Sequence, residues 1–380
     1  MTNISLYIHY PFCVSKCPYC DFNSYCNIHL SEDKLLDAYL KELEYYKKYF
    51  QNKQLSTIYF GGGTPSLMST NLLNKIFNKI TKITNISNNC EITLEANPNS
   101  INLDKMNDFK NIGINRLSIG IQSLYDTELK KLGRIHNRQE GIEAIENAQK
   151  VFKDKYSIDL IYTRPEQKLE DWKKELEEAV SLSPYHISLY QLIIEKGTQF
   201  YKNEVKLPEE NMSIDFYNFT RDFLNNKGLN FYEISNYAKK GYESKHNLVY
   251  WQNGEWIGIG AGAHSRANYN NKRYAIQNIK NPIKWYEKCI NKNNGISIRS
   301  ILSQEEIIEE FVLMGLRIKD GIDLKNLQKN IDCNSFYDIL NSNNIQLLAK
   351  NNLLTHTKNN IKLTKKGFLL LNSIIDKVLY

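Results

Sequence analysis

The segment YPFCVSKCPYCDF, residues 10–22, places three cysteines within eight positions. They are Cys13, Cys17 and Cys20, and their spacing is C-x3-C-x2-C. Two prolines stiffen the segment, because each fixes its own φ and restrains the residue before it. The segment directly follows a short β-rich run, and ligands in α/β folds bind at the carboxyl ends of strands. It therefore predicts a metal centre at the end of the first strand.

Two kinds of metal centre are compatible with clustered cysteines. Structural zinc takes four ligands, usually from C-x2-C pairs repeated at a distance, whereas this segment offers three cysteines. Cys26 lies six residues after the third and can in principle be a fourth ligand, although nothing in the spacing favours it. A 4Fe-4S cluster fits better, because thiolates hold it and three of them leave one iron open to a substrate or cofactor.

The composition is that of a soluble globular protein. The 380 residues are 42% hydrophobic and 24% charged, which suggests one large α/β domain with a smaller one. No stretch approaches a membrane span, and the N-terminus does not resemble a secretory signal, so we expect at most peripheral membrane contact. The net charge of +7 fits a lysine-rich solvated surface better than nucleic-acid binding. An odd cysteine count of seven argues against a disulfide framework and for a reducing, cytoplasmic location.

The first half of the chain alternates β-rich runs with amphipathic stretches. Six such units in succession predict a parallel sheet with right-handed crossovers. The expected strands are residues 5–10, 56–62, 91–98, 116–123, 156–163 and 186–192.

The pattern changes after about residue 200, and we expect three parts: 1–200, 201–280 and 281–380. Residues 228–238 and 246–265 are rich in aromatic residues and glycine and predict extra strands and loops. The last part predicts helices at 282–293, 303–318, 323–330 and 335–350, then two short strands around an Asn-Asn turn and a final helix. This arrangement suggests a small winged-helix-like domain.

The chain resembles the radical S-adenosylmethionine (SAM) family, whose cluster motif is C-x3-C-x2-C with an aromatic residue before the last cysteine. Within it, the chain is similar to the group related to oxygen-independent coproporphyrinogen III oxidase, and most to the heme-chaperone branch of that group. The matching stretches cover most of residues 1–265: YIHYPFCVSKCPYCDF, IYFGGGTPS, LEANP, RLSIGIQS, LGRIHN, SIDLIY and HNLVYWQ. The resemblance implies a partial (β/α)6 barrel with extra strands, a cluster on the three cysteines, and a bound SAM.

The resemblance also implies which residues contact SAM. Arg134 is a fork-shaped donor suited to a carboxylate, and Glu95 can accept hydrogen bonds from the ligand's amine or hydroxyls. Glycines after the second strand let backbone approach the ligand closely. The implied SAM residues are Tyr7, Tyr19, Gly62, Gly63, Thr64, Glu95, Gln122, Arg134 and Asp159, with His264 as a further candidate. For Glu95, a helix-capping carboxylate is the structural alternative.

Two departures separate this chain from the oxidase branch. That branch has a fourth cysteine two residues after the third, where this chain has Phe22, and a long N-terminal extension, where twelve residues precede Cys13. KHNLVYWQ, residues 245–252, matches the chaperone branch and makes His246 the candidate heme ligand. The structural alternative is that His246 and Asn247 only pin a loop. We therefore expect a protein that binds heme and delivers it to acceptor apoproteins, with membrane respiratory proteins as candidates and a homodimer as one option.

Two other functions stay open on the sequence. The SAM apparatus also suits a radical enzyme acting on a porphyrinogen or another substrate. The winged-helix-like tail and the positive charge suit a DNA-binding regulator with an iron–sulfur sensor, although a fold alone does not establish function.

Overall fold

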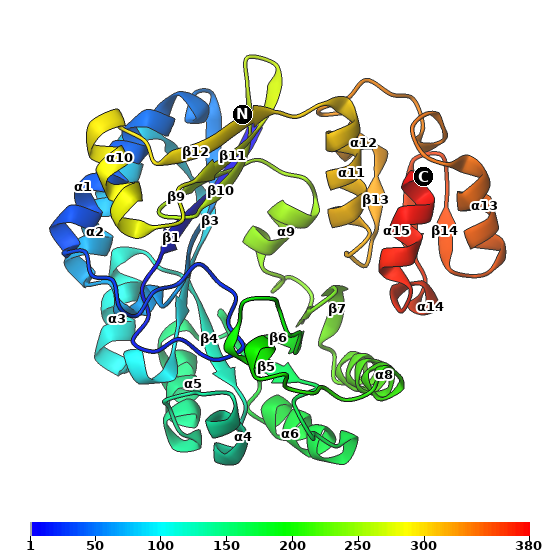
Figure 1. Cartoon of the computed structure of the whole chain (residues 1–380), viewed down its shortest axis with the longest axis horizontal. Helices are drawn as coiled ribbons and strands as arrows, with labels where there is room; N and C mark the ends of the chain where they lie inside the picture. The colour runs from blue at the N-terminus through cyan, green and yellow to red at the C-terminus, as the bar shows by residue number, and fades with distance from the viewer. Residues whose placement is uncertain (1) are drawn as a thin grey trace.

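The computed structural model describes residues 2–380 and is built on a twelve-stranded sheet with strand order β12-β11-β10-β9-β1-β2-β3-β4-β5-β6-β8-β7 (Figure 1). Strands β1 to β6 pair in chain order and run parallel, as the sequence predicts. Their bounds are β1 (Thr2–Tyr10), β2 (Lys53–Gly62), β3 (Asn85–Ala96), β4 (Arg116–Gln122), β5 (Tyr156–Tyr162) and β6 (His186–Gln191). This is the core of the expected α/β fold.

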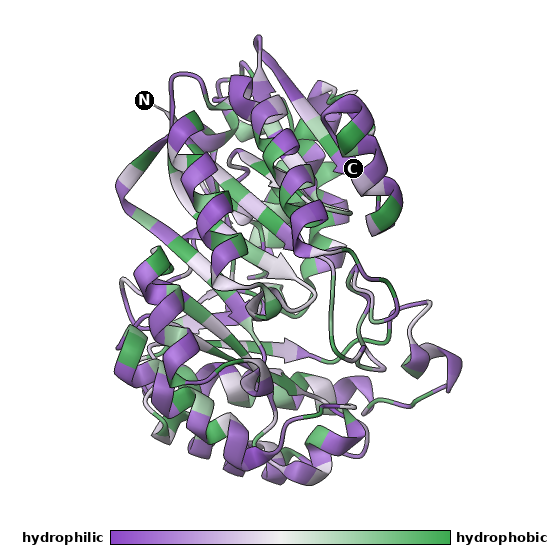
Figure 2. Ribbon diagram, turned by 90° about the vertical axis from the view of Figure 1, so that its left-hand side faces the viewer, coloured by the Kyte–Doolittle hydropathy of each residue, from purple (hydrophilic) through white to green (hydrophobic). Residues whose placement is uncertain are grey.

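Amphipathic helices connect these strands. In α2, for example, Leu72, Leu73, Ile76 and Ile80 are all buried, which is the spacing of one apolar helix face. Figure 2 shows polar and apolar residues alternating along the ribbon of the outer helices. The connecting helices are α1 (Glu32–Tyr46), η1 (Lys47–Phe50), η2 (Pro65–Leu67), α2 (Thr70–Ile83), η3 (Pro98–Ser100), α3 (Leu103–Ile112), α4 (Asp126–Lys131), α5 (Arg138–Phe152) and α6 (Leu169–Ser181).

Both edges of the parallel sheet are extended. After α7 (Gln199–Lys202) and α8 (Glu210–Asn226), the hairpin β7 (Asn230–Glu233) and β8 (Asn236–Ala238) joins β6. On the other edge, β9 (Trp256–Ile259) runs parallel to β1, and β10 (His264–Tyr269), β11 (Lys272–Asn278) and β12 (Ile296–Ile301) follow in antiparallel order.

The sheet continues past residue 281, where we expected the third part of the chain to begin. β12 pairs with β11, and the intervening α10 (Pro282–Lys292) packs on α1, with the rings of Tyr39 and Trp285 5.3 Å apart. Apolar contacts therefore join residues 282–301 to the sheet.

The segment KHNLVYW is a helix, α9 (Lys245–Trp251), so the expectation of strands and loops there was wrong. The side chain of Ser244 caps the helix by accepting a hydrogen bond from the backbone N–H of Asn247 at 3.3 Å. The helical turn brings His246 and Tyr250 to one face, because residues four apart stack along a helix.

The C-terminal residues form a small unit beside α8 and β7, drawn orange and red in Figure 1. It holds the three-stranded sheet β13-β15-β14 and short helices, in line with the expected winged-helix-like arrangement. Its elements are α11 (Gln304–Gly315), β13 (Ile322–Asp323), α12 (Leu324–Leu327), η4 (Phe336–Asp338), α13 (Ser342–Lys350), β14 (Leu354–His356), β15 (Asn360–Leu363), α14 (Lys365–Phe368) and α15 (Leu371–Leu379).

Two predicted C-terminal helices are shorter than expected. The span 323–330 keeps only α12, and 335–350 splits into η4 and α13. The split occurs because the side chain of Asn341 accepts from the N–H of Asn344 and starts a new helix there. Within residues 2–380, no helix has the length and apolar character to cross a membrane.

Candidate functional site

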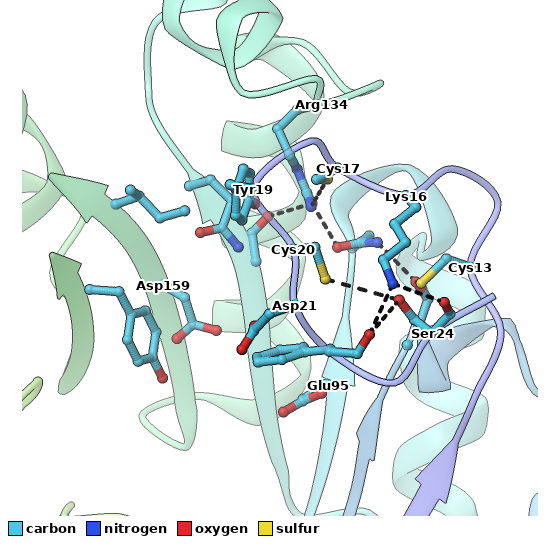
Figure 3. A pocket seen from close by; sticks show the side chains of 18 of the residues that line it. Cys13, Lys16, Cys17, Tyr19, Cys20, Asp21, Ser24, Glu95, Arg134 and Asp159 are labelled. Atoms are coloured by element: carbon cyan, nitrogen blue, oxygen red, sulfur yellow. Dashed lines mark hydrogen bonds between the residues drawn. The ribbon is translucent and has the colours of Figure 1, made fainter. Parts of the chain in front are cut away.

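A cavity of about 340 Å³ lies at the carboxyl ends of the parallel strands, beneath the cysteine loop (Figure 3). All three clustered cysteines line it, whereas Cys26 does not. The predicted SAM residues that line it are Tyr19, Gly62, Gly63, Thr64, Glu95, Gln122, Arg134 and Asp159. The fold thus brings together residues that come from six separate segments of the chain.

Each clustered thiol has its own polar neighbour. Thr64 Oγ1 lies 3.4 Å from Cys13 Sγ, and Ser24 Oγ lies 4.0 Å from Cys20 Sγ. Arg134 Nη1 donates to Cys17 Sγ at 3.5 Å. Hydrogen bonds to thiolate sulfurs tune the potential of iron–sulfur clusters, so these contacts suit cluster ligands.

The cavity offers three thiols, one fewer than the four ligands that a structural zinc site takes. Within residues 2–380, no three His, Cys, Asp or Glu side chains lie close enough to share one metal ion. A zinc site needs four ligands around one point, whereas each iron of a cluster takes its own thiolate. Burial raises the pKa of the Cys13 and Cys20 thiols, so metal binding would release protons from them. The donor set therefore fits a 4Fe-4S cluster better than zinc.

The two glycines at the end of β2, Gly62 and Gly63, serve the cysteine loop itself. The N–H of Gly63 donates to Tyr10 O at 2.7 Å, and a Cβ on Gly63 would lie 2.5 Å from Phe12 O. Gly62 has φ +114°, and a Cβ there would lie 2.6 Å from the His9 ring. Only residues without side chains allow β2 to hold the loop this closely. From the sequence we expected these glycines to let the backbone approach the ligand. In the structure, their close contacts are with His9, Tyr10 and Phe12 of the protein itself.

Arg134 lies where the loop after α4 meets the cysteines. Its Nη2 donates to Asn97 Oδ1 at 2.6 Å and to Gly120 O at 2.9 Å, while its buried Nε lacks a hydrogen-bond partner within residues 2–380. An unpartnered buried guanidinium nitrogen on a cavity wall suits an anionic ligand group. The carboxylate of SAM is such a group.

Two acidic side chains face the same cavity. Tyr59 Oη donates to Glu95 Oε1 at 2.8 Å and the N–H of Gly62 donates to Oε2 at 3.0 Å, yet burial raises the pKa of Glu95 to about 7. Asp159 lies inside β5 rather than at its end and accepts from Ser118 at 3.0 Å; burial raises its pKa as well. Buried acceptors here and Arg134 across the cavity match a ligand with cationic and anionic ends.

The donors and acceptors that line the cavity are chemically compatible with SAM. Arg134 would hold its carboxylate, and Glu95 and Asp159 would accept from its amine or ribose hydroxyls. When bound, the cluster supplies an iron with an open coordination position and one-electron chemistry.

Two of the predicted SAM residues lie elsewhere. Tyr7 and His264 line a second cavity of about 350 Å³, which shares only Phe22, Gly62 and Glu95 with the first. The second cavity is lined by residues of the paired strands β1 and β9 and of the start of β10, and Tyr250 and Trp256 add aromatic walls to it.

His246 is completely buried and has both ring nitrogens in hydrogen bonds. Thr57 Oγ1 lies 2.6 Å from its Nδ1, and Tyr250 Oη lies 2.7 Å from its Nε2. Burial lowers its pKa to about 3, which keeps the ring neutral. This geometry supports the structural alternative that the sequence left open, because the ring has no nitrogen free for an iron.

Sequence reasoning missed several cavity residues, above all Asn97. Its Nδ2 donates to Thr64 Oγ1 at 3.2 Å, so it joins Arg134 to the neighbour of Cys13. Strand periodicity could have found it, because residues two apart share a sheet face and Glu95 precedes it by two. Ser118 and Gly120 line the cavity for the same reason, with Gln122 next in the series.

Comparison with known proteins agrees with this geometry. The family model of the radical SAM superfamily matches residues 7–179, and that of the HemN C-terminal domain matches residues 302–370. The heme chaperone HemW of Buchnera aphidicola subsp. Acyrthosiphon pisum is 36% identical over 378 residues, which are 98% of this chain and 97% of that protein. The chain belongs to the HemW family of radical SAM proteins. The family includes the heme chaperone HemW of Lactococcus lactis, 34% identical over 99% of this chain and 97% of its own.

The similarity extends to eukaryotes. Radical S-adenosyl methionine domain-containing protein 1, mitochondrial, of Danio rerio is 33% identical over 99% of this chain and 86% of that protein. Among solved structures, coproporphyrinogen III oxidase (HemN) from Escherichia coli has a TM-score of 0.82 at 22% identity, covering 99% of this chain and 89% of its own. That match shows that this HemW-family chain has the HemN fold. As a radical SAM protein, it belongs to a superfamily typified by a 4Fe-4S cluster and SAM.

Proposed function

We propose that this protein is a heme chaperone: it binds heme and transfers it to acceptor apoproteins, for which membrane respiratory proteins are candidates. In this proposal a 4Fe-4S cluster is bound by Cys13, Cys17 and Cys20, and an exchangeable SAM occupies the first cavity. The observation that carries the proposal is a second, aromatic-walled cavity beside the first, in a chain whose near full-length relatives include heme chaperones.

The second cavity supports binding of a macrocycle for chemical reasons. Tyr7, Tyr250 and Trp256 offer flat aromatic surface, and Phe22 stands at the mouth with 60% of its surface exposed. Aromatic rings stack on flat conjugated ligands and remove large apolar areas from water. Heme combines such a face with charged propionates that remain near solvent.

The test is heme uptake followed by transfer. The chain is reconstituted with iron and sulfide without oxygen, and hemin is added at one equivalent. We expect a stable one-to-one complex, and loss of its absorption band when an excess of an apo-hemoprotein is added, with matching gain in the acceptor. Failure to retain heme through gel filtration would refute the proposal.

A second candidate function is a radical enzyme acting on a porphyrinogen or another substrate. It is favoured by the complete donor set of the first cavity, from the thiols to Arg134 and Glu95. An anaerobic assay with coproporphyrinogen III, SAM and a reductant separates the two. We expect no protoporphyrinogen IX, and steady multiple turnover would favour the enzyme.

A further inference from the structure

The second cavity contains three histidines on or near its walls, and they differ in what their rings already contact. His9 Nδ1 lies 2.9 Å from Tyr7 Oη, and its Nε2 lies 2.9 Å from Asn23 O. His246, behind Tyr250, also has both nitrogens in hydrogen bonds. His264 lines the cavity with an exposed side chain, and its ring nitrogens have no hydrogen bond within residues 2–380. His264 is therefore the imidazole that is free to bind a ligand.

The position of His264 is fixed through its backbone. Trp256 Nε1 donates to His264 O at 2.9 Å, and the rings of Tyr250 and Trp256 meet edge to face at 4.8 Å. His246 in turn holds the hydroxyl of Tyr250. The HNLVYW helix thus builds the aromatic wall beside His264, and its own histidine acts as a positioning residue for Tyr250.

The charges around His264 suit a ligand that carries carboxylates. Partial burial and the positive charges of Arg266 and Lys280 lower the pKa of His264, so its ring is neutral at physiological pH and can donate a lone pair to a metal. Arg266 is already paired with Glu310 through its Nε at 2.9 Å. Lys280 is exposed and has no ion pair within residues 2–380, so its ammonium group is free to meet a carboxylate.

We infer that a ring nitrogen of His264 is the axial ligand of heme bound in the second cavity, with the macrocycle against Tyr250 and Trp256 and a propionate beside Lys280. The inference rests on the proposed heme-binding function and assigns its site. Binding forms one nitrogen–iron bond and transfers no group. The heme then occupies a compartment next to the cluster cavity and separated from it by Phe22 and Glu95.

The experiment titrates ferric hemin into the full, cluster-loaded chain without oxygen and follows the heme absorption band. His264→Ala should weaken binding by more than about tenfold and remove the imidazole-type spectrum, and added imidazole should restore that spectrum. His264→Cys should convert the spectrum to that of a thiolate-ligated heme. His29→Ala, which changes an exposed histidine outside both cavities, is the matched control and should behave as wild type.

The outcomes separate this inference from the function on which it rests. If wild type binds heme and His264→Ala retains its affinity and spectrum, the assignment of His264 is wrong while the chaperone function stands. If wild type takes up no heme, the proposed function fails and the inference fails with it. SAM affinity, measured by calorimetry, should not change in His264→Ala, and this checks that the variant is folded.

Discussion

The two cavities share a wall yet are built from different chemistry. The first lies at the ends of parallel strands and contains three thiols, a guanidinium and two buried carboxyls. The second is lined by residues of β1 and of the extension β9–β10 and is walled mainly by aromatic rings. The parallel sheet carries the cofactor chemistry of the family, and the extension adds a separate compartment. One sheet can thus carry two adjacent cavities of different chemistry.

The largest effect is expected from replacing the cysteines that we assign to the cluster. Cys13→Ser, Cys17→Ser or Cys20→Ser should each abolish the cluster, because each thiol reaches the cavity from a different point of one loop. Cys26→Ser is the matched control, since Cys26 does not line the cavity. Iron and sulfide per chain after anaerobic reconstitution measure the effect.

The same variants test whether the cavities are independent. Heme uptake by the cluster-free Cys17→Ser chain should persist, because the second cavity contains none of the three thiols. If Cys26→Ser loses the cluster as completely as Cys17→Ser does, the three-ligand assignment is wrong.

The next largest effect is expected from Arg134. Arg134→Ala should weaken SAM binding by ~1.5–3 kcal/mol, the value of a hydrogen bond to a charged group. Calorimetry of the cluster-loaded chain measures it, and Arg138→Ala, outside the cavity, is the control. Heme affinity should not change. Unaltered SAM affinity would remove Arg134 from the SAM site.

A variant of His246 tests whether this residue is structural or binds heme in the second cavity. His246→Ala should lower the free energy of unfolding by ~2–4 kcal/mol, because it removes two buried hydrogen bonds, one with Thr57 and one with Tyr250. Thr57 keeps its hydrogen bond to Ser5, whereas the hydroxyl of Tyr250 loses the partner it has here. Urea denaturation measures this, with His29→Ala as an exposed control expected to change it by less than about 0.5 kcal/mol. The hemin complex should keep its imidazole-type spectrum; loss of that spectrum with unchanged stability would make His246 the ligand.

The last expected effect is a gradual one, a pH dependence from Glu95 in the shared wall. Burial raises the pKa of Glu95 from 4.5 to about 7, so between these values the folded chain retains a proton that the unfolded chain has lost. The free energy of unfolding should therefore fall as pH rises through this window, by up to about 1.4 kcal/mol per pH unit for one proton.

The matched variant is Glu95→Gln, which removes one titrating group and should make the slope between pH 4.5 and 7 less steep. Glu42 and Glu233, whose pKa values burial also raises to about 7, keep their share of the slope. Glu143→Gln changes an exposed residue of α5 and should leave the slope as in wild type. Urea denaturation across this range gives both slopes, and equal slopes for wild type and Glu95→Gln would show that Glu95 does not hold the proton.

The six parallel strands and the cysteine loop were predictable because their signals are local. A buried strand shows as a run of apolar residues, and the three thiols lie within eight positions of the chain. The residues that end or follow these strands, such as Glu95, meet at one edge because parallel strands all point the same way. Asn97 was within reach of the same reasoning.

The sequence by itself determined the six parallel strands, the cysteine loop and the family, since each depends on short continuous patterns. Only the tertiary structure decided that HNLVYW is a helix, that there are two cavities, and that His246 is buried while His264 is open. The physical reason is distance along the chain. The partner that occupies His246 is Thr57, 189 residues away, and no local pattern states which distant side chain will satisfy a buried ring.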